Sequence, residues 1–211
     1  MSTGRPAVER LTWRPPLTVG ALPIAMVVTA IGVGFNLLRL VMRLDHGPLV
    51  ASMLAFALLG CAAAVSAWAL GLDGHALGLR RSIAGRGLIG GALSASVLVG
   101  AALATAPVTR LPSAGQVLGG IALFGLCTAP AEELLFRGVL YAAVARELGP
   151  LAAVVVSSVA FAAAHVPVYG LGSLPVAICA GLVLGWLRWW SSSLAAPTAV
   201  HAVADLALLW L

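Results

Sequence analysis

Six ionisable side chains lie inside otherwise apolar stretches of the sequence. They fall in three segments: Glu132, Glu133 and Arg137 in 130–138, His165 in 161–167, and His201 with Asp205 in 201–205. An ionised residue at the centre of a membrane costs roughly 2.5–3.5 kcal/mol on insertion scales. Residues of this kind are therefore candidates for function, and each needs a partner.

The spacing within two of these segments predicts contacts on a helix. Glu133 and Arg137 are four residues apart, as in a helical ion pair, and so are His201 and Asp205. An aspartate in that position can hold an imidazole in one tautomer. Glu132 lies about 100° round the helix from Glu133 and is free to face another group. A purely structural alternative is one salt bridge plus a polar contact between helices, but it leaves Glu132 unpaired, which is costly in lipid.

These side chains are sufficient for a hydrolytic reaction. A glutamate and a histidine can activate water, while further donors stabilise an oxyanion. Glu132, His165 and His201 are also a ligand set that zinc accepts, so zinc-dependent and metal-free hydrolysis both stay open. The sequence has no His-Glu-x-x-His, Gly-x-Ser-x-Gly or Gly-x-Gly-Asp motif.

The composition places the chain in a membrane. Of its 211 residues, 61% are apolar and 9% charged, against about 25% charged in soluble domains. All twelve basic residues are arginine, and most lie at the edges of apolar runs, among them Arg39, Arg43 and Arg188. Arginines at these positions orient membrane loops, so the net charge of +5 does not indicate a nucleic-acid partner.

The apolar runs predict an all-α, polytopic transmembrane helix bundle. Spans of roughly 20 apolar residues fit seven segments: 17–40, 48–72, 87–107, 116–145, 150–166, 171–190 and 194–211. Residues 1–110 hold the first three spans and no motif, whereas 111–211 hold all the candidate site residues. Pro130 is expected to kink or interrupt its helix.

The predicted spans place His165 and His201 at different depths in the membrane. His165 lies near the end of the predicted 150–166 span, and His201 lies early in a helix that runs the same way. At 1.5 Å per residue they differ in depth by about 10 Å. A short, deep-starting 150–166 helix or a tilted last helix would bring them together.

The three segments together resemble the motif pattern of the CAAX protease and bacteriocin-processing family, which includes the type II CAAX prenyl endopeptidases. The segments read Glu132-Glu133-x-x-x-Arg137, Phe161-x-x-x-His165 and His201-x-x-x-Asp205, within residues 116–211. The third motif of that family most often ends in Asn, whereas this chain has Asp205. An ionised aspartate cannot donate a hydrogen bond.

The resemblance implies an intramembrane endopeptidase in which Glu132 and His165 activate water. His201, with Asp205, would stabilise the oxyanion, while Glu133, Arg137 and Phe161 support the site. The Arg-, Ala- and Gly-rich composition is typical of a GC-rich bacterial gene. We therefore expect a multi-pass protein of a bacterial cell membrane that acts on a peptide or membrane protein. The competing hypothesis is a transporter or bacteriocin-immunity protein that uses the same polar cluster as a relay or binding site.

Overall fold

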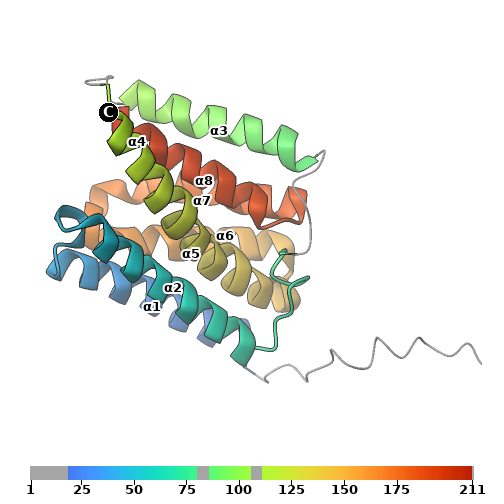
Figure 1. Cartoon of the computed structure of the whole chain (residues 1–211). Helices are drawn as coiled ribbons and strands as arrows, with labels where there is room; N and C mark the ends of the chain where they lie inside the picture. Colours follow the sequence, from blue (N-terminus) through green and yellow to red (C-terminus); the bar gives the residue numbers. More distant parts are fainter. Residues whose placement is uncertain (1–18, 80–85, 106–110, 211) are drawn as a thin grey trace, which may run out of the picture.

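The computed structural model describes residues 19–79, 86–105 and 111–210, and every regular element in these ranges is helical. The α-helices are α1 (Ala21–Val41), α2 (Leu49–Ala69), α3 (Arg86–Thr105), α4 (Ala114–Gly120), α5 (Ala129–Glu133), α6 (Tyr141–Tyr169), α7 (Leu174–Ser191) and α8 (Ala195–Ala207). Two π-helical segments, η3 (Ile121–Thr128) and η4 (Leu134–Leu140), flank α5. The expected all-α bundle is confirmed (Figure 1).

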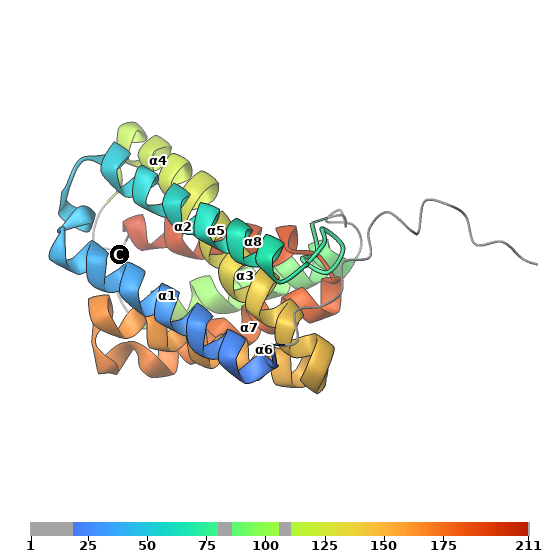
Figure 2. The ribbon, with the colours of Figure 1, turned by 90° about the horizontal axis from the view of Figure 1, so that it is seen from below.

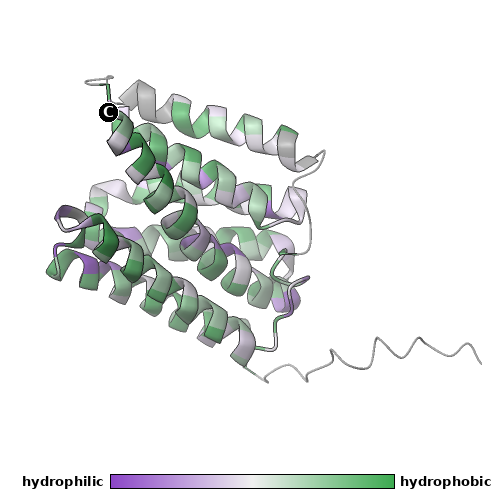
Figure 3. Cartoon of the chain, viewed as in Figure 1, coloured by the Kyte–Doolittle hydropathy of each residue, from purple (hydrophilic) through white to green (hydrophobic). Residues whose placement is uncertain are grey.

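Four helical stretches are long and apolar enough to cross a membrane: 21–41, 49–69, 114–169 and 171–191. Two shorter apolar helices, 89–100 and 195–210, accompany them. Hydrophobic residues occupy most of the length of these helices (Figure 3). Helices satisfy their own backbone hydrogen bonds, which is why apolar runs of this kind adopt them in lipid.

Glycine and a capping box set the limits of the long 114–169 stretch. Ser113 Oγ accepts from the Gln116 N–H at 3.2 Å, and the Gln116 side chain accepts from the Ser113 N–H at 2.9 Å. Gly149 has a φ of +85°, which divides α6 into two parts, as the boundary between the predicted 116–145 and 150–166 spans anticipated. Gly170, with a φ of +75°, ends α6.

Pro130 coincides with an irregularity of its helix, as expected, although the backbone is not broken there. It stands at the start of α5, and the backbone stays helical from α4 to Tyr141. Proline removes one backbone donor, and the changed hydrogen-bond register of the neighbouring π turns accommodates it. Such π turns are frequent at functional sites.

The helix that contains α5 lies at the centre of the bundle. Helix α2 packs against η3, α5 and η4, while α8 packs against η3 and α5. Helix α6 packs between α1 and α7, and α3 covers α7 and α8. Figure 2 shows α1 and α6 side by side below this central helix. The sequence segments that carry the ionisable residues therefore meet inside one bundle.

Candidate active site

The two glutamates of α5 are buried in the middle of the bundle. Glu133 has no exposed surface, and Glu132 is 3% exposed. Helix α8 packs against α5 and brings His201 to both carboxylates, while the second part of α6 brings His165 to Glu132. The structure therefore brings together the six predicted residues from three separate helices.

Glu133 is the centre of a buried charged cluster. Arg137 Nη1 donates to Glu133 Oε1 at 2.8 Å, which confirms the ion pair that the spacing predicted. His201 Nδ1 lies 2.9 Å from the same oxygen. Arg137 Nη2 also donates to the Gly181 carbonyl at 3.2 Å, so the guanidinium links η4 to α7. The cluster fixes the distance between the α5 carboxylate and the α8 imidazole.

Glu132 faces both histidines. Its Oε2 atom lies 3.8 Å from His165 Nε2 and 3.8 Å from His201 Nε2. Both separations exceed a direct hydrogen bond, and among the described residues this buried oxygen has no hydrogen-bond partner. Polar groups at such separations are commonly joined by a water molecule. One carboxylate oxygen is therefore aimed at two imidazole nitrogens.

The hydrogen bonds on the far side of each ring assign the tautomers. His165 Nδ1 lies 2.8 Å from the Phe161 carbonyl, which can only accept, so Nδ1 carries a hydrogen. His201 Nδ1 likewise donates to the Glu133 carboxylate. In both neutral rings, the Nε2 atom that faces Glu132 is an acceptor. Glu133, rather than Asp205, holds the Nδ1 side of His201; Asp205 Oδ2 lies 3.7 Å from its Nε2.

Phe161 packs against three members of this cluster. Its ring centroid lies 4.3 Å from the His165 ring, 5.6 Å from the His201 ring and 4.3 Å from Arg137 Cζ. The aromatic face against a guanidinium is a favourable cation–π arrangement. The ring therefore separates and orients the polar side chains without competing for their hydrogen bonds.

The predicted difference in depth between the two histidines is absent. Helix α6 continues through Pro167 to Tyr169, so His165 lies more than one turn before its end. Helix α8 has only 13 residues, and His201 lies near its middle. Helix α8 and the 3₁₀ turn that follows it cover residues 195–210, within the predicted 194–211 span.

The described His, Cys, Asp and Glu side chains form no group of three that is arranged to hold a metal ion. The 3.8 Å separations set Glu132, His165 and His201 slightly apart.

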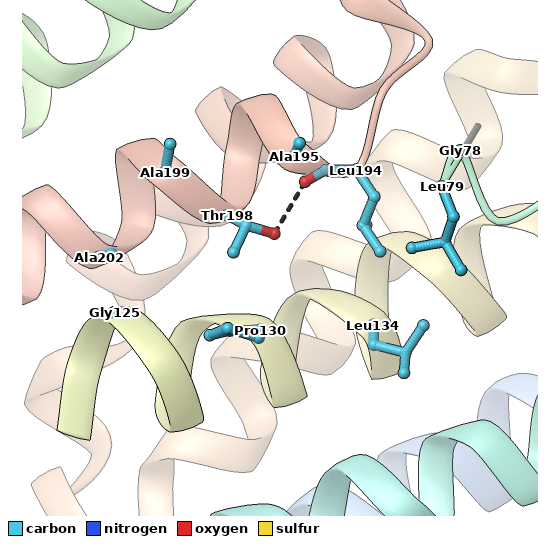
Figure 4. A pocket seen from close by; sticks show the side chains of 10 residues that line it. All are labelled: Gly78, Leu79, Gly125, Pro130, Leu134, Leu194, Ala195, Thr198, Ala199 and Ala202. Carbon is cyan, nitrogen blue, oxygen red and sulfur yellow. Dashed lines mark hydrogen bonds between the residues drawn. The ribbon is translucent and has the colours of Figure 1, made fainter. Parts of the chain in front are cut away.

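An apolar groove lies between the α5 region and α8, beside the charged cluster (Figure 4). It encloses about 460 Å³. Its lining is mostly small and apolar, and the Thr198 hydroxyl donates to the Leu194 carbonyl at 2.8 Å instead of pointing into the groove. None of the six predicted site residues lines it. The groove therefore offers shape and apolar surface but no acid or base.

Two buried arginines were missed because the sequence places them at the edges of apolar runs. Arg39 is 8% exposed, and its Nη1 donates to Asn36 Oδ1 at 2.7 Å. Arg188 is 5% exposed and donates to the carbonyls of Arg137 and Ala76 at 3.1 and 2.9 Å. The Asn36–Arg39 spacing of three residues was a usable signal, because it places both polar side chains on one helix face.

The helical bundle thus encloses a buried cluster of two glutamates, two histidines, an arginine and an aspartate. Residues 114–207 match the family model described as type II CAAX prenyl endopeptidase Rce1-like. This match to the C-terminal part of the chain supports the resemblance to the CAAX protease family that the three motifs predicted. No curated protein and no solved structure matches the chain.

Proposed function

We propose that this chain is an intramembrane endopeptidase that hydrolyses a peptide bond with a water molecule activated by Glu132 and His165. The observation that carries the proposal is the position of Glu132 Oε2, which is buried and 3.8 Å from the Nε2 atoms of both histidines. The match of residues 114–207 to the Rce1-like family model supports a protease of this kind.

Glu132 and His165 are suited to hold the attacking water. The carboxylate oxygen and the neutral His165 Nε2 are both acceptors, so they take the two hydrogens of one water molecule and leave its lone pair free. As the water oxygen bonds to the peptide carbonyl carbon, its proton passes to Glu132 and the carbonyl oxygen becomes an oxyanion. When the C–N bond breaks, the proton moves from Glu132 to the departing amine.

His201 is suited to stabilise the oxyanion. Donation from its Nε2 requires the imidazolium form. Three carboxylates face this ring: Glu133 at 2.9 Å, Asp205 at 3.7 Å and Glu132 at 3.8 Å. Their negative charge favours the cation, so Asp205 contributes without having to donate a hydrogen bond itself. A fixed donor beside a developing oxyanion is often the largest single contribution to catalysis.

We write this reaction without a metal. Zinc held by Glu132, His165 and His201 is the alternative. If it were bound, it would polarise the carbonyl and lower the pKa of a bound water. The two schemes differ in their response to a chelator.

The test is cleavage by purified protein in liposomes, with a prenylated CAAX peptide as the first fluorogenic probe and the same peptide without its prenyl group as the second. Glu132→Gln keeps the shape of the side chain but removes the base, so we expect a loss of roughly a hundredfold or more. His165→Ala should lose a similar factor. The double variant should lose little more, because groups that act as one unit are non-additive.

The matched control is Glu147→Gln. Glu147 is an exposed carboxylate on α6 that accepts from the Ala21 N–H, and glutamine retains an acceptor for that bond. Cleavage at the wild-type rate by Glu132→Gln would contradict the proposal. If no version cleaves either peptide, and Glu132→Gln abolishes a proton-coupled flux, the site is a transport relay instead.

A further inference from the structure

A second group of positively charged side chains lies at the C-terminal end of α1, outside the proposed active site. Arg39, Leu40, Arg43 and His46 line a cavity of about 430 Å³, which we call the α1 cation pocket. In the sequence between Arg39 and His46 there is one acidic residue, Asp45, so the segment keeps a net positive charge.

Arg39 is held rigidly in this pocket. Its side chain is 8% exposed, and its Nη1 donates to Asn36 Oδ1 at 2.7 Å. Asn36 is itself anchored, because its Nδ2 donates to the Gly32 carbonyl at 3.1 Å. The ring of Phe56, which is on α2, has its centroid 4.8 Å from Arg39 Cζ. A guanidinium fixed in this way loses little side-chain entropy when it contacts an anion.

The surroundings of the pocket indicate where it lies in the bilayer. Helix α1 is long and apolar enough to span a membrane, and the pocket is at its end. Leu40, Val41 and Met42 are 50%, 73% and 61% exposed beside the two arginines. Apolar side chains that project next to a cationic pocket match a ligand with a negative head and an apolar body.

We propose that the α1 cation pocket binds the phosphate of an anionic phospholipid headgroup, with the lipid chains against the exposed apolar end of α1. Arginine binds phosphate oxygens in bidentate geometry. Basic side chains near a membrane surface attract anionic lipids. This proposal does not depend on proteolysis, because it concerns residues outside the Glu132 cluster.

The pocket nevertheless adjoins that cluster. Arg39 interacts with Tyr169, the last residue of α6. The Tyr169 ring stacks on His165 with centroids 5.8 Å apart. The connections α1–α2 and α6–α7 lie at the same end of the bundle in both ribbon views (Figures 1 and 2). A lipid in the pocket would thus sit one aromatic ring away from a proposed catalytic side chain.

The experiment measures lipid binding to the full chain by native mass spectrometry during stepwise addition of phosphatidylglycerol, phosphatidylcholine or inorganic phosphate. The variant is Arg43→Asn, because Arg43 has a φ of +50° and asparagine tolerates that left-handed conformation. We expect preference for phosphatidylglycerol over phosphatidylcholine, and about fivefold weaker phosphatidylglycerol binding by the variant. Arg39→Lys, which keeps the charge but loses the bidentate fork, should also weaken binding.

The control is Arg146→Gln, which removes one exposed positive charge near the N-terminal end of α1. Unchanged phosphatidylglycerol binding by this control supports the pocket. An equal loss in Arg146→Gln, or equal binding of the two lipids, would overturn the proposal. Binding of inorganic phosphate with the same dependence on Arg43 would also overturn it, because the pocket would then be a site for a soluble anion.

Discussion

Arg137→Gln removes the only guanidinium that the structure places against Glu133. Arg137 is fully buried, and the substitution leaves a fully buried carboxylate with a single remaining donor, His201 Nδ1. It also removes the hydrogen bond to the Gly181 carbonyl and the contact with the Phe161 ring. Breaking one side of a buried pair costs roughly 3–5 kcal/mol. We therefore expect a lower midpoint of thermal unfolding in detergent, by roughly 6–20 °C for a chain of this size.

The matched measurement is a double-mutant cycle. Glu133→Gln alone leaves the Arg137 cation buried without its carboxylate, so it should destabilise by a similar amount. The double variant removes both charges and should be more stable than the sum of the two losses predicts, with a coupling of roughly 0.5–3 kcal/mol. Arg146→Gln, an exposed arginine on α6, is the control. Arg137→Gln with the thermal stability of that control would refute the ion-pair reasoning.

Three further outcomes are expected. Gly181→Ala should lower the unfolding midpoint, because its Cβ would lie 2.9 Å from Ser158 Cα and overpacking of this kind costs about 1–3 kcal/mol; Gly34→Ala, with open space around it, should not, and equal effects would contradict the close contact of α6 and α7. Asp205→Asn should retain activity to within about tenfold, because the variant keeps the His201 Nε2 donor, whose loss would cost roughly a hundredfold or more, and Glu133 still holds the His201 ring. A loss as large as that of the base variant would make Asp205 essential. A strong chelator should leave cleavage unchanged, and inactivation restored by about one equivalent of zinc would show that a metal is required.

The fold class was predictable because hydropathy depends only on local composition. The seven apolar segments all contain helices, and Gly149 divides α6 where the sequence indicated a boundary. The hydrogen-bond register around Pro130 was not predictable, because π turns depend on how neighbouring helices pack. The change from α-helix to a 3₁₀ turn after Ala207 was not predictable either, because the residues there are apolar like those of the rest of the predicted span.

For the candidate site, contacts within one helix could be predicted from residue spacing, whereas contacts between helices could not. The Glu133–Arg137 pair follows from a separation of four residues. The bond from His201 to Glu133 joins residues 68 positions apart, and no local pattern contains it. The sequence therefore assigned the role of holding His201 to Asp205, its neighbour on α8. The burial of Arg188 could not be predicted for the same reason, because the carbonyls that accept its hydrogen bonds lie on two segments distant in the sequence.

The continuous helix from α4 to the first part of α6 has a mechanical consequence. From Ala114 to the turn at Gly149 it contains about 35 residues, which as an α-helix would extend roughly 50 Å. The hydrocarbon layer of a bilayer is about 30 Å thick, and a tilt of up to about 40° takes up only part of the excess. The wider turns of η3 and η4 shorten the helix on either side of Glu132 and Glu133. We expect the remaining length to extend into the headgroup layers, so that acyl chain length changes the tilt of the helix that carries both glutamates.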